Sequence, residues 1–198
     1  MSSKKKNKGK AYKKKKSTMK SLLKPTVGQM ISMARSYPVY HCLVLDNWRK
    51  SGLTHVILAR EQPDGHLIFV DILVDLLCLG VKDCLLKANM PRPKYHSEFL
   101  ARTEELGRLI DTPLDLAHAI VYGAVDYARS LGFEPHPDYQ RCQMLLEPRE
   151  AFDELPEVEF GIEGKPRYVS GPYDDIDFVL ETLRDNVGQG NFDTFLML

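Results

Sequence analysis

The sequence predicts an α+β fold, in which an antiparallel β-meander packs against helices and a disordered basic segment precedes the folded domain. Three observations indicate this arrangement. Strand-like patterns occupy the chain up to about residue 76, and helical periodicity dominates after them. A lysine-rich segment at residues 1–24 has almost nothing to bury, so we expect it to be largely disordered and residues 25–198 to form one domain.

The centre of the predicted sheet is a β-hairpin. Its arms are residues 55–59 and 67–74, which are rich in β-branched and apolar side chains. Between the arms, Pro63 presets φ for a turn and Gly65 can adopt a positive φ without steric cost. Looser alternation at residues 39–45 predicts a further strand before the hairpin, which completes an antiparallel meander.

The second arm of the hairpin carries two acids in an otherwise apolar run. Asp71 and Asp75 are four residues apart and therefore lie on the same face of a strand. The run then breaks at residues 79–83, which we interpret as a turn that presents Lys82 and Asp83. We expect a functional site where this buried strand leads into the turn.

Helical periodicity predicts an amphipathic helix at residues 95–110 and a longer helix at residues 112–131. In the longer helix, Thr112 is the expected N-cap, Pro113 is the first helical residue and Gly132 follows the C-terminus. The pattern also predicts four shorter elements: a helix that begins near Pro25, a short helix from Pro137 through Leu146, a hairpin of residues 158–161 with 167–170, and a helix at residues 176–186.

Charge is distributed very unevenly along the chain. Residues 1–24 hold eleven lysines and no acid, so residues 25–198 hold 16 basic and all 27 acidic side chains. A segment of net charge +11 therefore precedes a domain of net charge −11. Clustered lysines neutralise phosphates and release counterions, so RNA or another polyanion is the expected partner of the segment. The lysines expected to bind nucleic acid are Lys4, Lys5, Lys6, Lys13, Lys14, Lys15 and Lys16.

The four cysteines have no metal-binding spacing. None of them forms a CxxC motif or a paired Cys/His pattern, so we expect reduced and mostly buried thiols. The apolar runs are too short to cross a bilayer, and no secretory signal is evident at the N-terminus. These features indicate a cytoplasmic protein without a membrane partner.

Three segments of the chain resemble an uncharacterised bacterial protein family. They are LVDLLCLGVKD at residues 73–83, AHAIVYGAVDYARSLGFEPHPDY at residues 117–139 and GKPRYVSGPYDD at residues 164–175. Some similar proteins are joined to a SEC-C metal-binding segment, which this chain lacks. The resemblance covers roughly residues 36–195 and implies one folded unit, but it implies no particular activity.

Ionisable side chains outside the lysine-rich segment are the candidates for chemistry. His118, Tyr122 and Asp126 are spaced by four residues and lie on one face of the long helix. If the protein is an enzyme, we expect this face to meet the segment of residues 75–83 and the turn at residues 136–138. The candidate catalytic residues are then Asp75, Lys82, Asp83, His118, Tyr122, Asp126, His136 and Asp138.

Carboxylates and imidazoles in this set could hold a metal ion. Asp71, Asp75, His118 and His136 are the candidate ligands. Their donor atoms are mainly oxygens, which favours Mg²⁺ or Mn²⁺ over Zn²⁺. A cysteine, Cys78 or Cys84, could instead be a nucleophile with His118 as its base. Each of these residues also has a structural explanation, such as a helix cap, a buried histidine or an ion pair on a helix face.

Two functions from different classes follow from these patterns. The first is a nucleic-acid- or ribosome-associated binding module, in which the lysine-rich segment adds salt-sensitive affinity. The alternative is a metal-dependent hydrolase, such as a nuclease, that uses the carboxylate and histidine candidates. No HExxH, Walker or GxSxG motif supports the alternative.

Overall fold

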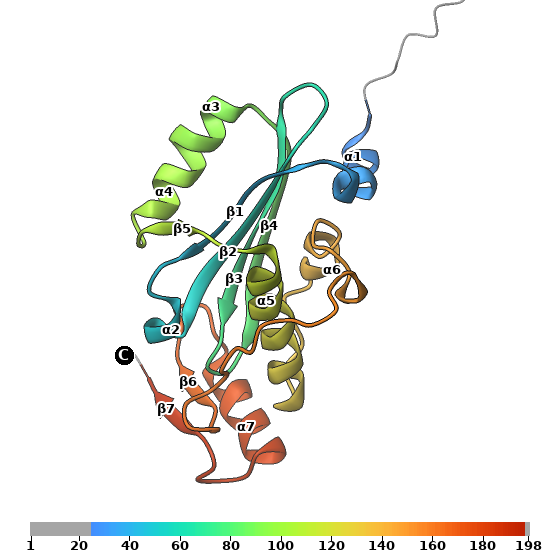
Figure 1. Cartoon of the computed structure of the whole chain (residues 1–198). Helices are drawn as coiled ribbons and strands as arrows, with labels where there is room; N and C mark the ends of the chain where they lie inside the picture. Colours follow the sequence, from blue (N-terminus) through green and yellow to red (C-terminus); the bar gives the residue numbers. More distant parts are fainter. Residues whose placement is uncertain (1–24, 197–198) are drawn as a thin grey trace, which may run out of the picture.

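A computed structural model describes residues 25–196, and it confirms the predicted α+β fold. A five-stranded antiparallel sheet has the strand order β4-β3-β2-β1-β5 (Figure 1). The predicted disorder of residues 1–24 and the seven candidate lysines there lie outside the described residues. The strands are β1 (Val39–Leu45), β2 (Leu53–Glu61), β3 (Leu67–Asp75), β4 (Gly80–Met90) and β5 (Leu109–Asp111).

The predicted meander of β1, β2 and β3 is confirmed. β2 and β3 pair without interruption from Leu53–Asp75 to Glu61–Leu67. Gly65 takes φ of 80° in the turn between them, where any other residue would be strained. β3 lies between β2 and β4, and most of its side chains on both faces are buried.

The turn predicted at residues 79–83 is wrong, because β4 already begins at Gly80. The chain reverses earlier, after Asp75. The pairing of β3 with β4 is irregular between Leu73 and Val74, which pair with Asp83 and Val81 and leave Lys82 as an extra residue in a β-bulge. This bulge interrupts the two-residue alternation, so the strand is difficult to recognise from the sequence.

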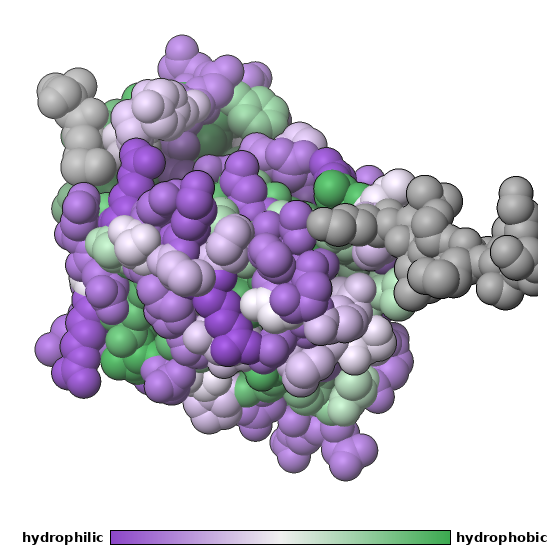
Figure 2. Space-filling model, turned by 90° about the horizontal axis from the view of Figure 1, so that it is seen from above, coloured by the Kyte–Doolittle hydropathy of each residue, from purple (hydrophilic) through white to green (hydrophobic). Residues whose placement is uncertain are grey.

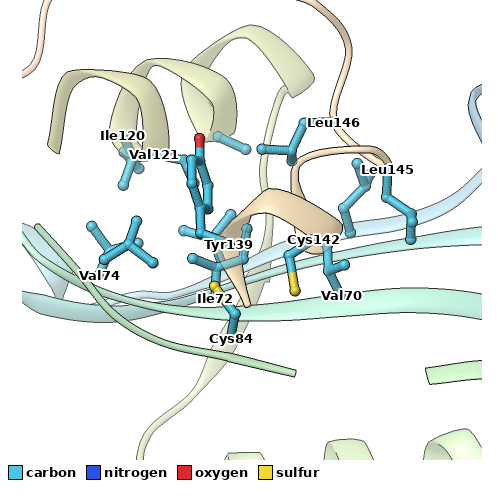
Figure 3. Packing of buried hydrophobic residues seen from close by; sticks show 14 of the residues in the cluster. Val70, Ile72, Val74, Cys84, Ile120, Val121, Tyr139, Cys142, Leu145 and Leu146 are labelled. Atoms are coloured by element: carbon cyan, nitrogen blue, oxygen red, sulfur yellow. The ribbon is translucent and has the colours of Figure 1, made fainter. Parts of the chain in front are cut away.

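Helices cover both faces of the sheet (Figure 1). One face carries α5 (Leu114–Ser130), α6 (Tyr139–Cys142) and α1 (Val27–Met33). The other carries α3 (Arg92–Lys94), a π-helix η2 (Tyr95–Leu100) and α4 (Ala101–Glu104). Figure 3 shows the larger core on the first face, where residues of α5 and of the α6 region pack over β3 and β4.

The helix predicted at residues 95–110 ends at Glu104. Gly107 adopts φ of 157°, and residues 109–111 become strand β5 instead of a last helical turn. β5 pairs with β1, whose outer backbone groups would otherwise lack partners at the edge of the sheet. The helical pattern of the sequence therefore extended into residues 109–111, which pair with β1 instead.

The long helix agrees with its prediction except at its first residues. α5 begins at Leu114, so Pro113 is the N-cap residue and not the first helical residue. Thr112 donates its hydroxyl to the carbonyl of Ile110 at 3.2 Å, so it is not the N-cap. Gly132 follows the helix with φ of 93°, as predicted.

The C-terminal part contains one correct and one wrong prediction. α7 (Ile176–Asn186) is confirmed, with Asp175 as its N-cap. The hairpin of residues 158–161 with 167–170 does not form. β6 (Arg167–Val169) pairs instead with β7 (Asp193–Phe195), in a parallel arrangement between distant parts of the chain. Such pairing leaves no local turn signal.

Short elements complete the fold. They are η1 (Ala34–Ser36), α2 (Trp48–Ser51) and η3 (Arg149–Ala151). α1 begins at Val27, two residues beyond the predicted start at Pro25, and its N-cap Thr26 forms a capping box with Gln29. None of the helices within residues 25–196 has the length and apolar character that a bilayer span requires.

Candidate functional site

Asp75 closes the turn between β3 and β4. Its carboxylate accepts hydrogen bonds from the backbone N–H groups of Leu77 at 2.8 Å, Cys78 at 3.2 Å and Leu79 at 3.1 Å. Burial raises the pKa of Asp75, although these three bonds and the nearby Lys82 ammonium favour its charged form. The oxygens of this candidate residue therefore hold the turn together.

Lys82 joins the start of β4 to the loop before α7. Its Nζ donates to Oδ2 of Asp174 at 2.9 Å, and the same oxygen accepts from Gly171 N–H at 2.8 Å and from the Tyr168 hydroxyl at 3.3 Å. Burial alone would raise the pKa of Asp174, but these three donors together lower it. The side chains of Lys82 and Asp174 are only 18% and 11% exposed, so the pair is a partly buried cross-link.

A small pocket, here called the Lys82 pocket, opens beside this ion pair. Its volume is about 210 Å³. The backbone N–H of His136 donates to the carbonyl of Val81 at 2.9 Å, which brings the turn at residues 136–138 to β4 as predicted. Neither Asp75 nor His118 lines the pocket. The lining residues are Leu79, Val81, Lys82, Phe133, Glu134, His136, Asp174, Asp175, Phe178 and Val179.

His136 lies between two acids at the rim of the Lys82 pocket. Its Nδ1 accepts a hydrogen bond from the backbone N–H of Asp138 at 3.2 Å. Its Nε2 is 4.0 Å from a carboxylate oxygen of Asp83. The structure thus brings together Lys82, Asp83, His136 and Asp138 from the candidate set, although Asp174 already neutralises the lysine.

His118 is buried in the core and serves the structure. Its Nδ1 lies 2.6 Å from the carbonyl oxygen of Leu114, and its Nε2 accepts from the backbone N–H of Glu147 at 2.8 Å. A carbonyl only accepts and an N–H only donates, so these partners require a neutral imidazole with its proton on Nδ1. Burial lowers the pKa of His118, in agreement with this neutral form.

Tyr122 and Asp126 lie on the same face of α5 as His118, as predicted, and they bind the same loop. The Tyr122 hydroxyl donates to the carbonyl of Glu147. The Arg149 guanidinium donates to both carboxylate oxygens of Asp126, at 2.7 and 2.8 Å, and lies 4.6 Å above the Tyr122 ring. These three candidate residues fasten residues 147–149 to the helix, away from the Lys82 pocket.

The remaining sequence candidates also have partners inside the chain. Asp71 accepts a hydrogen bond from His55 Nδ1 at 2.8 Å. Burial alone would lower the pKa of His55, but the hydrogen bond and the charge of Asp71 raise it. The predicted set of Asp71, Asp75, His118 and His136 therefore does not form a common site. Among the described residues, no three His, Cys, Asp or Glu side chains are grouped to hold a metal ion.

The four cysteines are free thiols and all are buried, as predicted. Burial raises the pKa of Cys78, which leaves it a weak nucleophile. The thiols of Cys84 and Cys142 form a hydrogen bond to each other, which raises the pKa of Cys84 and lowers that of Cys142. Figure 3 shows both sulfur atoms between α6 and the sheet. Neither predicted cysteine is hydrogen-bonded to His118.

Two arginines that the sequence did not single out hold the loop after α6. Arg60, on β2, is 2% exposed and donates to the carbonyls of Leu145 and Tyr37 at 3.0 Å and to Glu147 at 2.6 Å. Arg35 donates to carbonyls of the same loop at 2.5 and 3.1 Å. A lone arginine in the apolar β2 run was the available signal for Arg60, because an isolated buried charge is costly unless it is paired.

A second group of residues was missed on the opposite face of the sheet. The rings of Tyr40, His41, Tyr95 and His96 pack together, with centroid separations from 4.4 to 6.2 Å. The Tyr40 hydroxyl and His96 Nε2 are 2.9 Å apart. The signal was a Tyr-His dipeptide that occurs twice in the sequence, once in β1 and once at the start of the π-helix.

Comparison of the chain with protein-family models, with curated protein sequences and with solved structures gives no match. The resemblance to a bacterial family therefore stays a prediction, and the argument for function depends on the residues themselves.

Proposed function

We propose that the protein is a binding module for nucleic acid, including ribosomal RNA, and that it binds through the lysines of residues 1–24. The carrying observation is the separation of charge in the chain, +11 in residues 1–24 and −11 in residues 25–198. Such a lysine cluster neutralises several phosphates and releases their counterions, which gives affinity without sequence preference.

The ion pairs of the folded domain support this assignment to the lysine-rich segment. Seven of the sixteen arginines and lysines in residues 25–198 already bind a carboxylate, and the 27 acids of this part leave it with a net charge of −11, which disfavours phosphates. The pairs are Arg60–Glu147, Lys82–Asp174, Arg92–Glu61, Lys94–Glu98, Arg129–Glu134, Arg149–Asp126 and Arg167–Asp193. The face of the molecule in Figure 2 is mostly hydrophilic, with hydrophobic side chains in small separate patches, which agrees with a partner recognised by charge.

The junction with the segment is firmly attached to the domain. α1 starts at Val27, directly after its N-cap Thr26, which forms a capping box with Gln29. Arg35, just beyond α1, donates to the carbonyls of Leu146 and Gln143. Phosphate contacts by the preceding lysines would therefore hold the whole domain against the nucleic acid. Metal-dependent hydrolysis gains no comparable support from residues 25–196, where each candidate ligand has a partner inside the chain or lies apart from the others.

The salt dependence of RNA binding tests the proposal. The affinity of the full chain for a mixed-sequence single-stranded RNA is measured at several chloride concentrations. Contacts by seven lysines give a slope of log K against log salt of about −5, and replacement of three lysines reduces its magnitude by about 2. The variant K4Q/K5Q/K6Q should show this reduction.

A matched variant removes the same charge from the folded domain. K50Q/K87Q/K165Q replaces three exposed lysines. We expect it to keep the slope of the unmodified chain. Equal effects of the two triple variants, or no RNA binding at low salt, would refute binding through residues 1–24.

A further inference from the structure

Three buried polar atoms without a partner belong to side chains that lie around one ring. Six buried side-chain nitrogen or oxygen atoms of the described residues have no hydrogen-bond partner. Three of the six are His41 Nδ1, Arg92 Nε and Tyr95 Oη. All three side chains surround the ring of Tyr40. Arg92 Cζ lies 4.9 Å from the Tyr40 centroid, and the His41 and Tyr95 rings lie 4.4 and 6.2 Å from it.

We call Tyr40, His41, Arg92, Tyr95 and His96 the Tyr40 cluster. Its deepest member is Tyr95, which is fully buried and packs against Phe69 and Phe99. Its outer members are Arg92, with a side chain 41% exposed, and His96, which is exposed. The cluster therefore extends from the surface to a buried hydroxyl.

Two departures from regular backbone geometry build this cluster. Successive side chains of a strand normally point to opposite faces. The pairing of β1 with β2 is irregular between Val39 and His41, and this bulge brings the rings of Tyr40 and His41 to the same side. Tyr95 and His96 begin a π-helix, a rare conformation that is frequent at functional sites, as β-bulges are.

Burial of polar groups without partners is unfavourable, and native proteins rarely leave them so. The free groups of the Tyr40 cluster can all donate. Arg92 Nε only donates, Tyr95 has a hydroxyl proton, and His41 can carry its proton on Nδ1 because that atom has no partner. A group outside the chain with several acceptor oxygens would satisfy all three donors.

We propose that His41, Arg92 and Tyr95 bind a phosphate group. A tetrahedral oxyanion offers acceptors in several directions, and arginine is the side chain best suited to phosphate. At the rim, the Tyr40 hydroxyl and His96 Nε2 bind each other, so this pair has one further N–H or O–H that can donate to the phosphate. Two acids lie nearby. Glu61 accepts from Nη2 of Arg92, and the negative charge of Asp111 opposes the lowering of the His41 pKa by burial. This site is separate from residues 1–24 and does not depend on their function.

Calorimetric titration of the full chain with inorganic phosphate, and separately with adenosine 5′-monophosphate, tests the proposal at constant ionic strength. We expect Tyr95→Phe to weaken phosphate binding about tenfold or more, because it removes one hydrogen bond to a charged group. Arg92→Lys removes the Nε–H and keeps the charge, and we expect a similar loss. Equal affinities for the two ligands identify free phosphate as sufficient, and tighter binding of the nucleotide identifies a phosphate ester.

Tyr122→Phe is the matched control. It makes the same chemical change at a hydroxyl that already binds a backbone carbonyl, so it should leave phosphate affinity unchanged. The variant K4Q/K5Q/K6Q should bind phosphate as tightly as the unmodified chain. Absence of binding at millimolar phosphate would overturn the proposal. Unchanged phosphate affinity in Tyr95→Phe and Arg92→Lys would also overturn it and would indicate a buried water at the cluster.

Discussion

His118, on the α5 side of the sheet, and His41, on the π-helix side, are both imidazoles whose pKa burial lowers. Their partners differ. Both ring nitrogens of His118 have a hydrogen-bond partner in the backbone, whereas His41 Nδ1 is buried without one. A tyrosine ring in contact with each histidine repeats the contrast, since the Tyr122 hydroxyl donates to the Glu147 carbonyl and the Tyr95 hydroxyl has no partner.

This comparison shows that burial and a shifted pKa do not identify a functional histidine by themselves. Around His118 and Tyr122, the polar groups satisfy one another and fix the loop of residues 143–149. On the π-helix side, the backbone is distorted and donors stay open. Unsatisfied hydrogen-bonding capacity therefore distinguishes the two regions better than the type of residue does.

The largest expected effect is at Arg60. Arg60→Met removes the donor to two backbone carbonyls and a partner of Glu147, so we expect the free energy of unfolding to fall by about 3 kcal/mol. Urea denaturation, followed by the fluorescence of the single tryptophan, Trp48, measures it. Arg102→Met, at an exposed arginine of α4, should change the value by less than about 0.5 kcal/mol.

His118→Ala should have the next largest effect. The substitution leaves the Glu147 N–H without its acceptor and opens a cavity beside α5, so we expect a loss of about 2 kcal/mol. The matched variant is His136→Ala, at a side chain that is 33% exposed, with an expected loss below about 1 kcal/mol. Equal losses in the two variants would contradict the structural role of His118.

The pH dependence of stability separates histidines with opposite shifts. The pKa of His118 is lowered, so its contribution is complete above about pH 6.5 and is lost as pH falls below that value. His55 has a raised pKa, so its contribution is complete below about pH 6.5 and is lost as pH rises.

Urea denaturation at about pH 7.5 and 5.5 measures these contributions. The stability lost on acidification should be smaller in His118→Ala, and larger in His55→Gln, than in the unmodified chain. An unchanged pH dependence in His118→Ala would show that this imidazole is protonated as readily in the folded protein as in the unfolded chain.

The smallest effects come from two matched hydroxyl deletions. Tyr122→Phe should lower the free energy of unfolding by about 1 kcal/mol, because the Glu147 carbonyl loses its donor. Tyr95→Phe should raise it by roughly 0.5 to 1 kcal/mol in the absence of phosphate, because it removes a buried hydroxyl without a partner. The same sign for both variants would remove the contrast between the two regions.

Local patterns predicted much of the fold. The hairpin of β2 and β3 was recognised because Pro63 and Gly65 mark its turn and the arms are β-rich. α5 and α7 were recognised because their periodicity is long and their ends are marked. β4 was missed because a bulge interrupts its alternation. β5 was missed because its residues have a helical pattern and form a strand only by pairing with β1.

The candidate site was predicted less well than the fold. The shared face of His118, Tyr122 and Asp126 follows from spacing alone and is correct. Their partners in the loop lie 23 to 29 residues further along the chain, so no local pattern could show that these residues bind a loop and not a substrate. Asp174, which neutralises Lys82, is likewise distant in sequence.

The sequence by itself determined the elements with a strong local signal and the separation of a basic segment from an acidic domain. Only the tertiary structure decided which polar groups are satisfied. The physical reason is that a hydrogen bond depends on where a distant donor or acceptor is placed to within a few tenths of an ångström. Residue type and spacing along one helix or strand carry no such information, so the open donors of the Tyr40 cluster were visible only after the chain was folded.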